Sequence, residues 1–157
     1  MGVTRVIEDD ATMAWVERIG GTATWVTSVC TGALILGAAG LLRGYKATTH
    51  WAWRDHLPLF GAEPVAERTV VDRNRVTGGG VTAGIDFALT LTALLRGEDH
   101  ARMLQLAFEY DPAPPFDTGS PEAAGPALVA AYRRRADRMA PTRDADLRAA
   151  ALRRGFA

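Results

Sequence analysis

The stretch VTSVCTGALILGAAG, residues 26–40, decides the fold of this chain. Residues 24–29 are mostly β-branched or aromatic and too few for a helix, so they predict a strand. Residues 32–40 are small and apolar and end on a glycine, which predicts a buried helix. Cys30 lies between the two segments and is therefore expected on a sharp turn from strand to helix.

Cys30 on such a turn has two interpretations. A nucleophile at the junction of a strand and a helix is held exposed above the strand ends. The free N–H groups and the partial positive charge of a helix start favour the thiolate, which is the reactive form. Thr31 follows with a hydroxyl and an N–H that can bind an attacking group or an oxyanion, and Gly32 allows close approach of the backbone. The alternative is a buried, unreactive cysteine, because free cysteines are often buried.

Strands and helices alternate along the rest of the chain. Asp9 and Asp10 predict the start of a helix that Gly20 and Gly21 end. Further helices are predicted at residues 51–57, 81–95 and 98–110, and further strands at 44–49, 68–72 and 75–77. The last two strands are separated by two residues, which indicates a hairpin.

Two segments near the carboxyl end differ from this pattern. Residues 111–116 contain three prolines, which remove backbone donors and exclude regular structure. The tail from Ala127 is rich in alanine and arginine and predicts one or two amphipathic helices broken near Pro141. We therefore expect a main domain over residues 1–126 and a helical tail over residues 127–157.

The alternation predicts an α/β layered fold with a mostly parallel sheet. A parallel strand normally follows a βα unit packed beside it, and residues 1–9 predict no strand. We therefore expect the sheet to lack its first strands and the main domain to be partial.

The composition and charge of the chain exclude several classes of partner and site. The 157 residues, 48% of them hydrophobic and 23% charged, suffice for a sizeable core. Eighteen basic residues balance eighteen acidic ones, so nucleic acid is not an expected partner, and no apolar run predicts a membrane span. One cysteine excludes an internal disulfide and fits a cytoplasmic location. Three histidines and one cysteine without ligand spacing predict no metal site.

Several motifs in this sequence resemble those of one superfamily. The run at residues 26–42 resembles the cysteine elbow of the ThiJ/PfpI superfamily, which has a class I glutamine amidotransferase-like fold. Ala-Thr-Thr-His-Trp at 47–51 and the glycine-rich segment 78–86 resemble it too. The runs at 109–116 and 119–122 resemble the isonitrile hydratase branch. The elbow and the Thr-Thr-His-Trp run also occur in sensor domains of AraC-type transcription regulators.

The resemblance implies a homodimeric flavodoxin-like protein that hydrates a small-molecule isonitrile to an N-substituted formamide without a cofactor. Cys30 matches the family nucleophile, which attacks the isonitrile carbon to give a thioimidate that water opens. Thr31 matches a residue that hydrogen-bonds the intermediate or the water. Gly32, Gly79 and Val81 match positions expected to bind substrate, the last two at a mobile helix start.

One part of the family pattern is not matched. The family uses an acidic residue from the loop after its first strand as an acid/base group. The opening Gly2-Val3 resembles the end of a later glycine-rich loop, and Glu8, Asp9 and Asp10 are better explained by a helix start. We therefore expect an N-terminally truncated sequence and impaired activity.

Two other classes of function stay open. One is the ligand-sensing domain of an AraC-type regulator, and the other is a redox or stress-response protein in which Cys30 oxidises to a sulfinate. Among the histidines, His50 is expected to satisfy a local hydrogen bond. His56 and His100 have charged neighbours in the sequence and are expected to be solvated.

Overall fold

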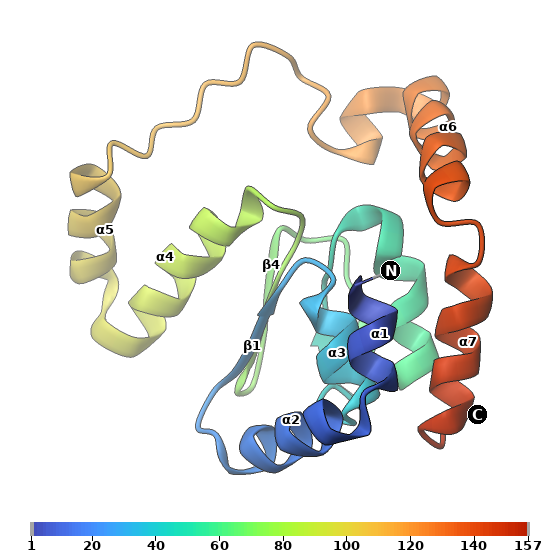
Figure 1. The fold of residues 1–157 in the computed structure, drawn as a ribbon. Helices are drawn as coiled ribbons and strands as arrows, with labels where there is room; N and C mark the ends of the chain where they lie inside the picture. Colours follow the sequence, from blue (N-terminus) through green and yellow to red (C-terminus); the bar gives the residue numbers. More distant parts are fainter. Residues whose placement is uncertain (1, 157) are drawn as a thin grey trace. The chain divides into compact units, whose positions relative to one another are not determined.

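The structure is a computed structural model that describes residues 2–156. It contains two compact units (Figure 1). Unit 1 comprises the residues up to Phe87 together with those from Thr142 onward, and unit 2 comprises Ala88–Pro141. The predicted division at residue 126 stays a prediction.

A three-stranded sheet in the order β1-β5-β4 lies in unit 1. Strand β1 (Val26–Val29) pairs in parallel with β5 (Arg75–Gly78), which pairs antiparallel with β4 (Thr69–Asp72). The predicted first strand and the predicted hairpin are thus both confirmed. A second, parallel pair joins β2 (Lys46–Ala47) to β3 (Glu63–Pro64), so pairing is mostly parallel among the residues that the structure describes.

The start of unit 1 is helical, which corrects one expectation. Gly2–Glu8 form helix α1 rather than the end of a loop. Thr4 and Ile7 lie one turn apart on this helix and are buried, and α1 packs against α3 (Gly32–Ala38). Burial of one face therefore holds these residues in a helix.

Helix α2 (Asp10–Thr22) begins as predicted and ends later than predicted. Asp9 is its N-cap and accepts a hydrogen bond from the N–H of Ala11 at 3.1 Å. The helix continues through Gly20, where the tip of the Leu41 side chain packs against the glycine. Packing here outweighs the low helix propensity of glycine, about 1 kcal/mol.

The helix predicted at residues 51–57 is a 3₁₀ helix, η1, over Trp51–Phe60. It includes Pro58 and so extends past residue 57, where the predicted helix ends. Gly61, with a φ of 72°, ends the helix, and its N–H donates to the carbonyl of Pro58 at 3.0 Å.

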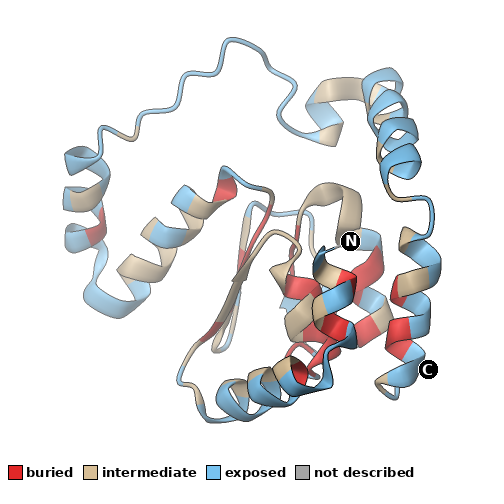
Figure 2. Cartoon of the chain, in the orientation of Figure 1, coloured by how far each residue is buried: buried red, intermediate tan, exposed pale blue. Residues whose placement is uncertain are grey.

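The core of unit 1 lies between these helices and the sheet, as the buried residues in Figure 2 show. Leu34 of α3, Phe60 of η1 and Leu147 of α7 (Arg143–Arg153) are all fully buried. The ring of Phe60 meets the ring of Phe156 edge to face, with centroids 5.6 Å apart. The carboxyl-terminal helix is therefore part of this core.

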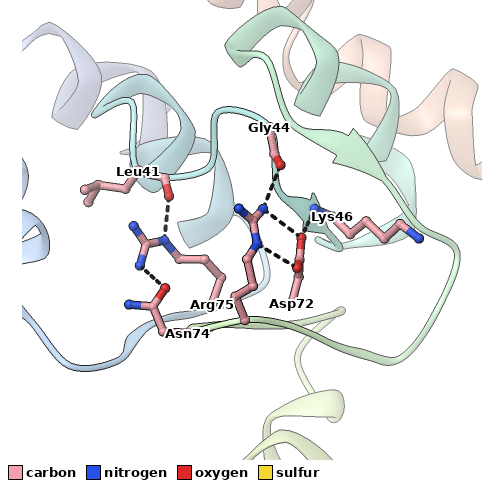
Figure 3. A network of polar contacts seen from close by, with 7 residues as sticks. Leu41, Gly44, Lys46, Asp72, Asn74 and Arg75 are labelled. Atoms are coloured by element: carbon pink, nitrogen blue, oxygen red, sulfur yellow. Dashed lines mark hydrogen bonds and ion pairs between the residues drawn. The ribbon is translucent and has the colours of Figure 1, made fainter.

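A polar network ties the β4–β5 hairpin to the segment that leads into β2 (Figure 3). The Asp72 carboxylate accepts from the backbone N–H of Lys46 at 2.8 Å. Arg73 donates to the carbonyl of Gly44 at 2.7 Å, and its guanidinium lies 3.5 Å from the ring centroid of Tyr45. Arg75 donates to the carbonyl of Leu41 at 2.6 Å. The network fixes where β2 begins.

Unit 2 is helical. Its helices are α5 (Glu98–Ala107), α6 (Pro121–Met139) and the part of α4 (Ala83–Arg96) that begins at Ala88. Gly125 kinks α6, and residues 111–116 form no helix or strand, as predicted. No helix within residues 2–156 is long and apolar enough to cross a membrane.

Candidate functional site

Cys30 occupies a strained turn directly after β1. Its φ of 56° places a non-glycine residue in the left-handed region, which costs free energy and is held only where neighbours fix it. The N–H of Cys30 donates to the carbonyls of Gly78 at 3.0 Å and Gly79 at 2.9 Å. The sharp turn that the sequence predicts is therefore present, and two glycine carbonyls hold its amide. The cysteine is partly exposed.

The carbonyl of Cys30 is bound as firmly as its amide. The Thr49 hydroxyl donates to this carbonyl at 2.7 Å, and the N–H of Ala33 does so at 3.3 Å. Thr49 is 2% exposed. Nothing in the local sequence around Cys30 reveals this contact, because the two residues are 19 positions apart. In the sequence this segment is marked only by the Thr-Thr-His-Trp motif, and the motif assigns no role to its threonines.

Thr31 and Gly32 lie where the turn enters α3. Thr31 precedes the helix, and its hydroxyl makes no capping hydrogen bond to it. The hydroxyl is thus not committed to the helix start. A Cβ placed on Gly32 meets the Cβ of Ser28 at an ordinary contact distance of 3.5 Å, so packing alone does not require glycine there.

The three glycines at positions 78–80 contact Cys30 through the carbonyls of Gly78 and Gly79. The carbonyl of Gly79 accepts from Cys30, and its N–H donates to the carbonyl of Arg68 at 2.9 Å. Val81 differs, because it is 81% exposed and lies in the turn before α4. The structure therefore brings Gly79 to Cys30, while the substrate-binding roles of Gly32, Gly79 and Val81 stay predictions. Beyond this segment, Asp86 pairs with Arg68, which also donates to the Thr82 hydroxyl at 3.1 Å.

His50 follows Thr49 and packs over the same glycine segment. A Cβ on Gly80 would lie 2.7 Å from His50 Cδ2, so the ring needs a glycine beneath it. His50 Nδ1 accepts from the N–H of Ala52 at 3.2 Å, which caps η1. Burial lowers the pKa of His50, so the ring is neutral near pH 7 with its proton on Nε2.

The expectation that His56 is solvated is wrong. His56 is 8% exposed, and its Nε2 lies 2.9 Å from the Asp144 carboxylate. The hydrogen bond to His56, followed by the one to Arg143, holds the pKa of Asp144 below its ordinary value. Because Asp144 lies 88 positions away in α7, sequence neighbours gave no sign of this pair. His100 is exposed, as expected.

A metal site needs several ligating side chains close together. Within residues 2–156 no group of three or more His, Cys, Asp or Glu side chains is placed to hold a metal ion. The groups that lie at the turn itself are the Cys30 thiol, the Thr31 hydroxyl and nearby backbone groups.

Comparison with known proteins places this geometry in a family. The model of the DJ-1/PfpI family matches residues 2–94. The chain is 56% identical to isonitrile hydratase of Pseudomonas putida over 135 residues, which is 86% of this chain and 59% of that enzyme. It is 32% identical to the HTH-type transcriptional regulator CdhR of Pseudomonas aeruginosa over 91 residues, 55% of this chain and 26% of the regulator.

A solved structure agrees with these sequence matches. A ThiJ/PfpI family protein from Pseudomonas syringae superposes with a TM-score of 0.85 and 48% identity, over 96% of this chain and 60% of that one. The chain thus spans about three fifths of the length of this protein and of the hydratase. The similarity confirms the predicted flavodoxin-like α/β fold. From the cysteine turn, the fold and the matched residues together, we conclude that the chain belongs to the DJ-1/PfpI family.

Proposed function

We propose that this chain carries the nucleophile of an isonitrile hydratase-like enzyme, a carbon–nitrogen hydratase that gives N-substituted formamides. The observation that carries the proposal is the 56% identity to isonitrile hydratase over 86% of the chain. The left-handed conformation of Cys30 supports it, because such strain is concentrated at functional sites.

The proposed reaction adds one water to one isonitrile. The Cys30 sulfur bonds to the isonitrile carbon, and that carbon takes up a proton to give a thioimidate. Water then adds to the same carbon, the carbon–sulfur bond breaks, and the thiol is restored as the nitrogen takes up a proton. The product is the N-substituted formamide, and no oxidant, reductant or metal enters the balance.

Thr31 is the proposed partner of the intermediate or of the attacking water. Its hydroxyl is adjacent in sequence to Cys30 and is not used to cap α3. Gly32, Gly79 and Val81 are proposed to line the substrate, with Gly79 additionally bound to the nucleophile's amide. The family acid/base carboxylate matches none of the 157 residues, so we expect slow turnover from this stretch of sequence alone. A homodimer and a cytoplasmic location are part of the same proposal.

Replacing Cys30 with serine tests the proposal. Formamide produced from an alkyl and an aryl isonitrile is measured by chromatography for the unaltered chain and for Cys30→Ser. We expect formamide above the uncatalysed background with Cys30 and none above it with serine, because a hydroxyl is far less nucleophilic than a thiolate. Thr31→Val is expected to reduce turnover by about 10- to 100-fold, in the range of a lost transition-state hydrogen bond.

The same assay separates the alternatives. Equal turnover by Cys30→Ser would contradict the proposal. Saturable binding of the isonitrile with no formamide in either protein would favour a ligand-sensing domain. Selective conversion of Cys30 to a sulfinate by mild peroxide, seen by mass spectrometry in a protein without turnover, would favour a redox role.

A further inference from the structure

We infer that Thr49 is the positioning residue that holds the Cys30 turn in its reactive conformation, through the hydrogen bond from its hydroxyl to the Cys30 carbonyl. The inference deepens the proposed function, because it assigns a second residue to the same site. Its central test measures the reactivity of the thiol itself and does not depend on which substrate the protein takes.

The Cys30 peptide groups have few partners, and Thr49 supplies the shortest bond among those described. The Thr49 hydroxyl lies 2.7 Å from the Cys30 carbonyl, whereas the N–H of Ala33 lies 3.3 Å away. A non-glycine residue at a φ of 56° returns to more common backbone angles unless its neighbours fix it. Loss of the hydroxyl would leave the carbonyl with one long hydrogen bond.

The position of Thr49 is itself fixed by buried contacts. The N–H of Thr48 donates to the Thr77 hydroxyl at 2.9 Å. Thr48, Thr49 and Thr77 are each no more than 2% exposed. Thr77 lies on β5 opposite Ser28, two residues before Cys30. Upstream, the Asp72 network of Figure 3 holds the N–H of Lys46 at the start of β2. The hydroxyl of Thr49 thus comes from a segment anchored at two residues that precede it, Lys46 and Thr48.

Thr48 provides a matched control. It is as buried as Thr49 and adjacent to it, but its hydroxyl contacts the carbonyl of Thr49 at 3.5 Å and not that of Cys30. Thr48→Val and Thr49→Val therefore remove the same group from the same environment. They differ in whether the Cys30 carbonyl loses its donor.

The experiment measures the rate at which iodoacetamide alkylates the chain across a range of pH. Cys30 is the only cysteine, so the rate reports on the turn alone. We expect Thr49→Val to lower the rate at pH 7 by about threefold or more and to alter its pH profile, because the relaxed turn moves the thiol out of its environment. Thr48→Val and Thr49→Ser are expected to stay within about twofold of the unaltered chain.

Turnover gives the second readout. If the unaltered chain forms formamide, Thr49→Val is expected to lower kcat with little change in KM, and Thr49→Ser to restore kcat. Alkylation and kcat equal in folded Thr49→Val and Thr48→Val would overturn the inference. An effect on alkylation in a protein inert toward isonitriles would uphold the inference and contradict the proposed function.

If Thr49→Val folds poorly, a second pair of variants tests the same hydrogen bond. Thr49→Ser and Thr49→Ala both lose the methyl group, and only serine retains the hydroxyl. With folding checked by circular dichroism, slower alkylation in Thr49→Ala than in Thr49→Ser supports the inference. Equal rates in these two variants overturn it.

Discussion

Different interactions stabilise units 1 and 2. In unit 1 a continuous cluster of buried side chains joins helices from both ends of the chain. The cysteine turn donates a hydrogen bond to Gly78 of β5 and accepts one from Thr49. In unit 2 the structure describes a single buried residue, Ala101. Its helices are specified by local signals, such as the Ser120 hydroxyl that accepts from the N–H of Ala123 at 3.2 Å. Unit 1 therefore depends on packing, and unit 2 depends on helix propensity and capping.

We expect the largest loss of stability from truncating a buried side chain in the core of unit 1. Phe60 is fully buried and Phe108 is 70% exposed. We expect Phe60→Ala to lower the free energy of unfolding by about 3–5 kcal/mol, through lost apolar contact and the cavity left behind. Phe108→Ala is expected to change it by less than about 0.5 kcal/mol. Urea unfolding followed by Trp fluorescence measures both, with Phe60→Leu as a milder core variant. Equal effects would contradict the comparison.

Helix caps give a smaller effect that differs between the units. Asp9 caps α2 in unit 1 and Ser120 caps α6 in unit 2. Asp9→Ala is expected to lower the free energy of unfolding of unit 1 by about 1 kcal/mol. Ser120→Ala is expected to reduce helical circular dichroism while the unfolding midpoint of unit 1 stays unchanged. A shift of that midpoint by Ser120→Ala would show that the units are not independent.

The smallest effect is the pH dependence of the contact between α7 and η1. Because hydrogen bonds from His56 and Arg143 lower the pKa of Asp144, its carboxylate stabilises the fold fully above its unfolded pKa of about 3.9. That contribution is lost as pH falls through the lower folded value. Asp144→Asn is expected to cost less than about 1 kcal/mol at pH 7, since the carboxylate is largely exposed. The difference from the unaltered chain should close as the Asp144 carboxylate becomes protonated, and a gap that widened on acidification would contradict this.

Local patterns in the sequence predicted much of the frame around the site. The β-branched run before Cys30 and the small residues after it gave the strand, the turn and α3. The two-residue spacing between residues 68–72 and 75–77 gave the hairpin. These features depend on neighbours a few positions apart, where side-chain periodicity and turn chemistry determine the backbone.

Such local patterns could not predict contacts between residues that lie far apart in the sequence. His56 was expected in solvent because its neighbours are charged, yet Asp144 and the packing of α7 bury it. The contact of Thr49 with Cys30 depends on where the segment that begins with β2 lies relative to the cysteine turn, and Asp72 binds the N–H at the start of that strand. The helix over Gly2–Glu8 likewise depends on burial against α3 rather than on any local signal.

The contact between Gly37 and Phe60 limits how the site can vary. A Cβ on Gly37 would lie 2.9 Å from the Cβ of Phe60, so any larger residue there separates α3 from η1. Helix α3 begins two residues after Cys30, and η1 begins two residues after Thr49. The missing side chain of one glycine therefore sets how closely α3 and η1, the helices that follow Cys30 and Thr49, approach each other. A larger residue at position 37 of this chain would therefore have to be accommodated by a change at Phe60.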